Sequence, residues 1–270
     1  MDVLAANPDA GAFYDAIWSG GPSVSALVHG VGFIGQESLL TGDEITAFAR
    51  RAGITADTTV LDIGSGRGGP ACHLARVFGC RVLGIDLSRV GHAQAEARTR
   101  ADGLGDKVEF RLGDIHAVDL PSTAFDVVIG FDAWCHIPRR RALLQRCADL
   151  LRPGGRVAFY DHVERRPHPD EERRTFHALW RFAGLETPAS YLEAVEAAGL
   201  KIRFREETSV HAARFYTGVV EVYVAERAQF ESLVGPDRYT ERLERLRLIQ
   251  RLAASGVLGQ LACIAEKPRG

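Results

Sequence analysis

Short apolar runs alternate with helix-like segments along the middle of this 270-residue chain. A run from Thr59 to Ile63 leads into a glycine-rich loop and then into a segment with helical periodicity. The same order recurs at later runs, which begin at Arg81, Val108, Phe125 and Arg156. Because neighbouring parallel strands need a crossover between them, this alternation predicts an α/β fold with a doubly wound, mostly parallel sheet.

The segments after the fourth run predict how the sheet continues. The apolar spacing of residues 139–151 predicts a helix that the sequence Pro153-Gly-Gly stops before the strand at Arg156. Residues 164–174 are charged and contain proline, so we expect irregular chain there. A helix is expected from Thr187 to Gly199, and strands at 201–207 and 258–266 flank two helices within 210–254. This gives seven strands in all.

Length and composition are those of one catalytic domain with helical additions. We expect a helical cap over residues 1–53, which includes a helix at 43–50, and a core over 55–165. Residues 166–270 would supply acceptor-side helices and the last two strands. The tail helices at 210–254 would form a lid or a surface for a homodimer.

The charge and the cysteines narrow the classes of function. The formal net charge of −2 gives no global field that attracts nucleic acid or an anionic membrane. No apolar stretch has the length of a membrane span and no basic leader begins the chain, so we expect a cytoplasmic protein. The five cysteines lack paired metal-ligand spacing and are interpreted as reduced, buried residues, with no metal expected.

The loop Gly64-Ser-Gly-Arg-Gly-Gly formally fits the dinucleotide fingerprint, with glycines at 64, 66 and 69 between a strand and a helix. Asp62, two residues before the first glycine, argues against a pyrophosphate ligand because like charges repel. A carboxylate there suits a nucleoside that carries an α-ammonium and a sulfonium. The glycines would still allow that ligand to approach the backbone closely.

Two further acids follow successive strands. Asp86 ends the second run and is suited to accept hydrogen bonds from both ribose hydroxyls, while Asp114 ends the third and is suited to an adenine amino group. An aspartate after a strand is often only a turn former or a helix cap. Three acids at successive strand ends outweigh that interpretation, so we expect them at one nucleoside site.

These motifs together resemble the class I S-adenosylmethionine-dependent methyltransferases. The resemblance is carried by Val60-Leu-Asp-Ile-Gly-Ser-Gly-Arg-Gly-Gly-Pro-Ala, Gly84-Ile-Asp-Leu-Ser, Gly113-Asp-Ile, Phe125-Asp-Val-Val and Leu151-Arg-Pro-Gly-Gly. They are most similar to the branch with the sarcosine/dimethylglycine, tocopherol and sterol methyltransferases. The match covers roughly residues 55–165, and Phe13-Tyr-Asp with Trp18 and His29-Gly are more loosely similar to the cap of that branch.

The resemblance implies a Rossmann-like fold, S-adenosyl-L-methionine as cofactor and a set of contact residues. It implies that Asp62, Gly64 and Gly66 hold the methionine end, and that Ser65 between the two glycines also contacts the cofactor. By the same resemblance the nucleoside is held by Asp86, Leu87, Asp114 and Ile115, and the methyl-donor side is lined through backbone contacts by Phe131, Asp132 and Ala133. Ser65 stands where many relatives carry cysteine, and Asp132-Ala-Trp-Cys-His leaves the acceptor undefined.

Methyl transfer needs alignment of the reacting atoms more than it needs a protein nucleophile. A base is required only for a protonated acceptor, and His136, just after the fourth strand, is the first candidate because imidazole titrates near neutral pH. Tyr14 is the second candidate. A structural hydrogen bond at a helix start is the alternative explanation for His136.

Several other residues are weaker candidates for contact with the acceptor. Aromatic side chains that would either wall an acceptor pocket or pack in the core are Tyr14, Trp18, Trp134, Phe176, Trp180 and Phe182. His162 is expected at the rim where acceptors enter, and His211 in the lid. Arg139-Arg-Arg is interpreted as a solvated helix start, with a phosphate clamp as the alternative.

The predicted function is therefore methyl transfer to a small-molecule acceptor, with nitrogen of an amine or heterocycle favoured over carbon or oxygen. The alternatives are C-methylation of an isoprenoid-like or natural-product acceptor, and an enzyme that consumes the cofactor without methylating. A catalytically silent binding module and an NAD-dependent reductase are the remaining hypotheses, and the intact acids argue against both.

Overall fold

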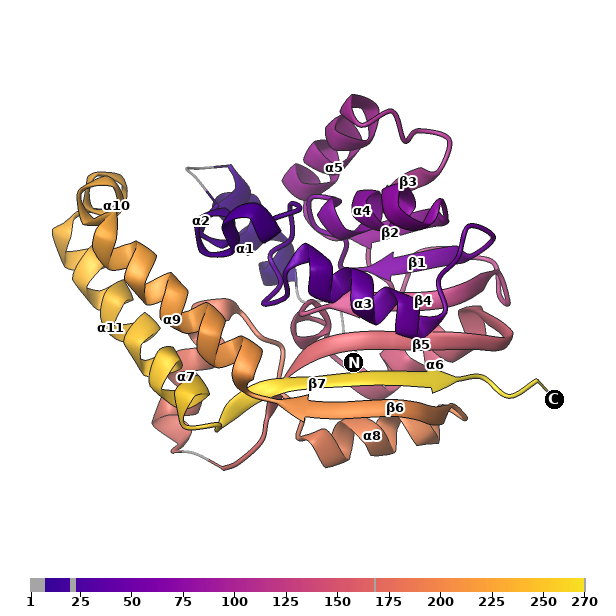
Figure 1. Cartoon of the computed structure of the whole chain (residues 1–270). Helices are drawn as coiled ribbons and strands as arrows, with labels where there is room; N and C mark the ends of the chain where they lie inside the picture. Colours follow the sequence, from indigo (N-terminus) through magenta and orange to yellow (C-terminus); the bar gives the residue numbers. More distant parts are fainter. Residues whose placement is uncertain (1–7, 20–22, 168, 270) are drawn as a thin grey trace.

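The computed structural model describes residues 8–19, 23–167 and 169–269. Seven strands form one sheet in the order β3-β2-β1-β4-β5-β7-β6 (Figure 1). Their bounds are β1 Thr59–Ile63, β2 Arg81–Asp86, β3 Val108–Leu112, β4 Phe125–Phe131, β5 Leu151–Glu164, β6 Lys201–Thr208 and β7 Leu258–Glu266. All neighbours pair in parallel except β7, which runs antiparallel to β5 and β6. The predicted α/β sheet is confirmed.

Helices cover both faces of this sheet. Their bounds are α1 Pro8–Trp18, α2 Val24–His29, α3 Gly42–Ala52, α4 Gly69–Phe78, α5 Arg89–Ala101, α6 Arg140–Leu150, α7 Asp170–Trp180, α8 Pro188–Ala197, α9 Val210–Ala225, α10 Arg227–Val234 and α11 Pro236–Ala254. Among these described helices, none is both long enough and apolar enough to cross a membrane.

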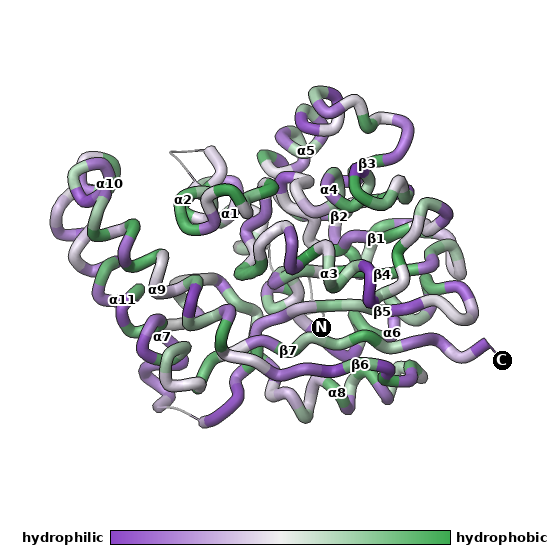
Figure 2. Tube along the Cα trace, viewed as in Figure 1, coloured by the Kyte–Doolittle hydropathy of each residue, from purple (hydrophilic) through white to green (hydrophobic). Residues whose placement is uncertain are grey.

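Alternation along each strand divides the core into two layers. Leu61 and Val128 belong to the cluster that packs on α6 and α8, whereas Val60 and Val127, their chain neighbours, belong to the cluster that packs on α3 and α4. Successive side chains of a strand point to opposite faces, so a strand buried on both faces is apolar throughout. Figure 2 shows the contrast with β6, the mostly hydrophilic edge strand.

The last helices form a separate projection. Helices α9, α10 and α11 extend away from the sheet, and α2 packs against α9 on the side where α1 lies (Figure 1). Their shared apolar cluster includes the stacked rings of Tyr223, Phe230 and Tyr239. Sequence analysis predicted two helices here. The structure has three, because Gly235, at a φ of 85°, separates α10 from α11.

Two other boundaries differ from the predictions. Helix α6 ends at Leu150 and β5 begins immediately, so the Pro153-Gly-Gly sequence lies inside the strand rather than before it. Leu151 already pairs with Phe125 of β4, and the register shifts between Phe125 and Val127. Helix α7 begins at Asp170, within the stretch predicted to be irregular, and the acids of its first turn favour a helix N-terminus.

Candidate active site

One cavity lies at the carboxyl ends of β1, β2, β3 and β4, beneath α1 and the loop before α3. Every residue that the sequence singled out for catalysis or cofactor binding lines it: Tyr14, Asp62, Gly64, Ser65, Gly66, Asp86, Leu87, Asp114, Ile115, Phe131, Asp132 and His136. It encloses about 990 Å³, counted out to its mouth. Ligand pockets of α/β sheets are found at this edge.

The glycine loop has a shape that other residues would not allow. Gly64 and Gly66 have φ angles of 81° and 53°, in the left-handed region that favours glycine. A Cβ on Gly64 would lie 2.4 Å from the Cβ of Ala133, and one on Gly66 would lie 3.3 Å from the ring of Trp18. The loop is therefore packed closely between the end of β4 and α1.

Asp62 is the acid whose side chain is least satisfied by the protein. It is buried at the end of β1, and its Oδ2 has no hydrogen-bond partner among the described residues. Burial, with a smaller contribution from Asp86, raises its pKa to about 7. A buried acceptor atom without a donor is costly. A ligand with an ammonium group would supply the hydrogen-bond donor that Asp62 Oδ2 lacks.

The other two predicted acids have partners in the backbone. Asp86 accepts hydrogen bonds from the N–H of Gly66 at 2.8 Å and from that of Ser88 at 2.8 Å, and burial raises its pKa. Asp114 accepts from the N–H of His116 at 3.0 Å. Both therefore form turns as well as line the cavity, and each carboxylate oxygen keeps a lone pair for a further donor.

Asp132 lines the cavity at the end of β4 but directs its carboxylate into the protein. Its backbone is left-handed, with a φ of 52°. Oδ2 accepts from the Ser38 hydroxyl at 2.6 Å and the Leu39 N–H at 2.9 Å, and Oδ1 accepts from the Gln260 amide at 2.5 Å. These bonds tie the end of β4 to the loop before α3 and to β7.

Tyr14 and His136 meet across the cavity although they are 122 residues apart. The Tyr14 hydroxyl lies 2.9 Å from Nε2 of His136, and Nδ1 of the same ring lies 3.4 Å from the carbonyl oxygen of Arg181. Since a carbonyl can only accept, Nδ1 carries the proton and the Tyr14 hydroxyl donates to Nε2.

The expectation that His136 titrates near neutral pH is wrong. Burial lowers the pKa of His136 to about 3, and burial also raises that of Tyr14. The position of His136 just after the fourth strand did not indicate that its ring would be buried. At neutral pH both side chains are uncharged and hydrogen-bonded to each other.

Sequence analysis missed the loop before α3, which supplies Gln36, Glu37 and Ser38 to the cavity, and it missed Arg67. Arg67 donates to Glu37 at 2.5 Å. This loop packs directly against the start of α4, and only glycine fits at the contact. A Cβ on Gly69 would lie 2.4 Å from the backbone of Gly35. No local motif marks the loop, so only the tertiary structure reveals it.

Three weaker predictions are corrected by burial. Trp134 is 1% exposed, packs in the core and donates from Nε1 to the Ile63 carbonyl at 3.1 Å, so it does not wall the cavity. His162 is buried rather than at a rim, and its Nε2 lies 3.0 Å from the Tyr216 hydroxyl. Arg140 is 6% exposed rather than solvated, whereas Arg141 beside it is exposed.

Of the remaining candidates, Trp18 lines the cavity, whereas the others lie outside it or outside the described residues. His211 lies 3.4 Å from a carboxylate oxygen of Glu44, and the ring of Phe182 packs between those of His136 and His162. The side chains of Phe176 and Trp180 lie outside the described residues. The five cysteines are buried, as predicted.

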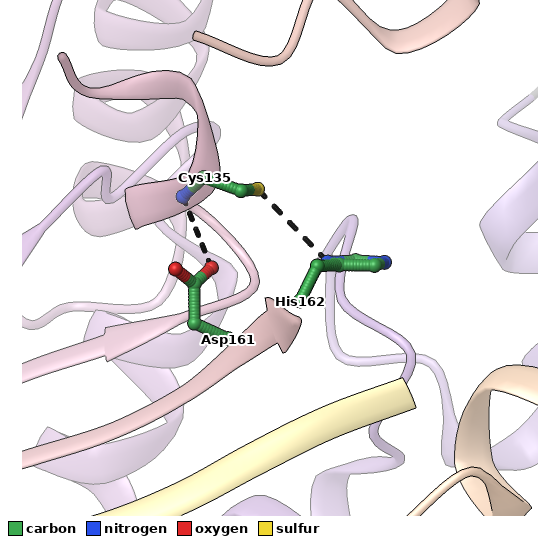
Figure 3. Close-up of side chains that lie close together, drawn as sticks. All are labelled: Cys135, Asp161 and His162. Carbon is green, nitrogen blue, oxygen red and sulfur yellow. Dashed lines mark hydrogen bonds between the residues drawn. The ribbon is translucent and has the colours of Figure 1, made fainter. Parts of the chain in front are cut away.

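Cys135, Asp161 and His162 lie together beside the cavity (Figure 3), with potential ligand atoms within 4.8 Å of one another. Their hydrogen-bonding groups are already engaged. Asp161 accepts from the Cys135 N–H at 3.1 Å and the Tyr191 hydroxyl at 3.0 Å, and it lies 3.8 Å from the Arg140 guanidinium. A carboxylate paired with a buried cation has little charge left for a metal ion.

Comparisons with known proteins agree with this geometry. Residues 60–155 match the family model described as a methyltransferase domain. The chain is 40% identical over 115 residues to the sterol 24-C-methyltransferase of Eremothecium gossypii, covering 43% of this chain and 31% of the relative. It is 28% identical over 231 residues to the glycine/sarcosine/dimethylglycine N-methyltransferase of Actinopolyspora halophila, covering 85% and 40%. The chain thus spans less than half the length of these relatives.

A solved structure extends the agreement to the whole chain. The geranyl diphosphate C-methyltransferase from Streptomyces coelicolor A3(2) superposes with a TM-score of 0.76 at 16% identity, over 99% of both chains, which shows a shared fold. The domain match, the relatives and the fold agree in what this chain is similar to, namely class I S-adenosylmethionine-dependent methyltransferases.

Proposed function

We propose that this chain transfers a methyl group from S-adenosylmethionine to a small-molecule acceptor. The observation that carries the proposal is the unpartnered, buried Oδ2 of Asp62 beside the glycine loop. A pyrophosphate bound in this cavity would place its negative charge against the carboxylates of Asp62 and Asp86, which would repel it. An α-ammonium supplies both the missing donor and the opposite charge.

The other lining residues have consistent roles. Asp86 would accept from the ribose hydroxyls, and Asp114 with Ile115 would meet the adenine edge. Gly64, Ser65, Gly66, Leu87, Phe131 and the backbone of Asp132 would shape the remaining wall. When bound, the cofactor supplies an electrophilic methyl group on a sulfonium, and the protein holds the acceptor in line at ~3–3.5 Å while excluding water.

Tyr14 and His136 bound the cavity at its acceptor end. Because burial keeps His136 neutral, we propose that it positions the Tyr14 hydroxyl instead of taking a proton from the acceptor. An uncharged amine or heterocyclic nitrogen already carries the lone pair that attacks the methyl carbon. The weakness of the available base therefore favours nitrogen over an oxygen acceptor that must lose a proton.

Two alternatives keep the same cofactor. C-methylation of an isoprenoid-like acceptor is favoured by the resemblance to the sterol enzyme. Consumption of the cofactor without a methylated product is the second. We also propose the division into a cap over 1–53, a cofactor core over 55–165 and acceptor-side elements over 166–270, all in one domain.

The test begins with calorimetry of the purified chain with S-adenosylhomocysteine, and with NADH as the control ligand. We expect binding of the first and none of the second. A mass-resolved screen of amines, heterocycles and prenyl alcohols with S-adenosylmethionine then follows. Products heavier by one methylene unit support methyl transfer, and cofactor loss without such a product supports the non-methylating alternative. A folded chain that binds no S-adenosylhomocysteine contradicts the proposal.

A further inference from the structure

We infer that the acceptor end of this cavity takes an electrically neutral group and rejects phosphate and diphosphate. The inference rests on the proposed function, since it concerns the molecule that meets the cofactor. Its basis is the distribution of charge on the lining residues and on those directly behind them.

Acidic side chains outnumber basic ones around the cavity. The acids that line it are Glu37, Asp62, Asp86, Asp114 and Asp132. Within the described part of the chain, Arg67 is the one arginine or lysine that lines it. The residues left undescribed contain no lysine or arginine, so the sequence holds no further cationic side chain of these types that could complete the wall.

Arg67 is already paired. Its guanidinium donates to Glu37 at 2.5 Å, and both side chains are largely covered, at 18% and 23% exposed. Glu37 is fixed in place by the hydroxyls of Ser23 at 2.9 Å and Ser25 at 2.5 Å. The Nε N–H of Arg67 is buried with no partner among the described residues, so one donor remains, but its charge is balanced.

Two cations just outside the cavity, Arg140 and Arg214, are also paired. Arg140 lies behind it against Asp161 and donates to the carbonyl of Trp134. Arg214, on α9, donates to Glu44 at 2.8 Å. If Arg140 turned toward a ligand, it would leave a buried carboxylate without its counter-charge, which is costly. If Arg214 turned, it would break both of its hydrogen bonds to Glu44.

The polar groups at the acceptor end are likewise engaged. The Tyr14 hydroxyl donates to His136, and the Ser38 hydroxyl donates to Asp132. Ile137 and Pro138 add apolar surface to the wall of the same cavity. A phosphate needs several charge-assisted donors when it leaves water. This end offers apolar surface and pre-bonded neutral groups, which suit an uncharged amine, heterocycle or alkene.

The test measures binding of inorganic diphosphate and of phosphoethanolamine to the chain saturated with S-adenosylhomocysteine, by calorimetry with and without Mg²⁺. We expect no saturable binding by the parent. Glu37→Gln releases Arg67 and should create diphosphate affinity at least about tenfold above that of the parent. Glu109→Gln is the matched control, because it frees Arg111 from a 3.0 Å ion pair on exposed β3.

The outcomes separate this inference from the proposed function. Failure of S-adenosylhomocysteine to bind contradicts the proposed function itself. If that ligand binds and the parent also binds either phosphate probe, with or without Mg²⁺, only the inference of a neutral acceptor is overturned. Equal diphosphate affinity in the parent, Glu37→Gln and Glu109→Gln would show that Arg67 is not the cation that Glu37 neutralises, which also overturns it.

Discussion

Two buried aspartates at the same edge of the sheet differ in how the protein satisfies them. Asp161, at β5, accepts from a backbone N–H and a tyrosine hydroxyl and faces the Arg140 guanidinium. Asp62, at β1, has an oxygen with no partner among the described residues, and the charge that acts on it is that of another acid, Asp86. The two side chains are equally buried, but Asp161 of β5 stabilises the fold, whereas Asp62 of β1 is left for a ligand.

The largest expected effect concerns the satisfied acid. Asp161→Ala leaves Arg140 buried without its counter-charge, so we expect the free energy of unfolding to fall by about 3–5 kcal/mol in chemical denaturation. Glu231→Ala, which removes the half-buried partner of the exposed Arg227, should cost less than about 1 kcal/mol. The double variant Asp161→Leu/Arg140→Met should recover most of the loss. Equal stability of Asp161→Ala and Glu231→Ala would remove the distinction between the two aspartates.

Asp62→Asn tests the unsatisfied acid. Loss of one charge-assisted hydrogen bond to the α-ammonium should weaken S-adenosylhomocysteine binding by about 10–100-fold in calorimetry. Stability of the empty protein should stay equal or rise, because a buried charge with no partner is removed. Asp106→Asn, at an exposed position, is the control. Unchanged affinity in Asp62→Asn would contradict the assignment of this carboxylate to the cofactor.

A smaller effect, on the rate of catalysis, is expected from Tyr14, which we place between the cofactor and the acceptor. Tyr14→Phe removes the hydroxyl that His136 accepts, and we expect kcat to fall by about tenfold with little change in S-adenosylhomocysteine affinity. Tyr239→Phe loses a comparable buried bond, to the Tyr223 carbonyl at 3.0 Å, far from the cavity, and should leave kcat unchanged. Parallel losses in both variants would indicate a general effect on stability instead.

The smallest effect is a pH dependence. With a pKa of about 7, Asp62 in the empty protein gains its charge as pH rises, so S-adenosylhomocysteine affinity should increase about threefold between pH 6.5 and 7.5. The unfolded chain releases this proton near pH 3.8, so the stability contribution of Asp62 to the empty protein falls as pH rises from about 4 to 7. Asp62→Asn should abolish both trends, and a flat affinity profile in the parent would contradict them.

The sequence predicted the part of the site that is built from local order. Asp62, Asp86 and Asp114 end successive parallel strands, and parallel strands bring their carboxyl ends to one edge. Periodicity likewise predicted the sheet. These features depend on residues close together in the chain, where spacing and turn chemistry decide the structure.

The sequence did not predict the features that depend on contacts between residues far apart in the chain. Arg140 is buried against Asp161 from the next strand, and nothing in Arg139-Arg-Arg distinguishes its middle member from the half-buried Arg139 or the exposed Arg141. The Glu37–Arg67 pair joins two loops separated by α3 and β1. The low pKa of His136 follows from its burial, to which the rings of Tyr14 and Phe182 contribute although they are far apart in the chain.

The bond from Gln260 to Asp132 has a consequence for biosynthesis. All the cavity-lining residues that the structure describes lie between positions 10 and 138, yet one carboxylate among them is held by a strand from the other end of the chain. A nascent chain that ends just beyond Pro138 already contains every lining residue that the structure describes but lacks β7, which separates β5 from β6. Cofactor binding should therefore begin only after β7 has emerged from the ribosome and paired with β5.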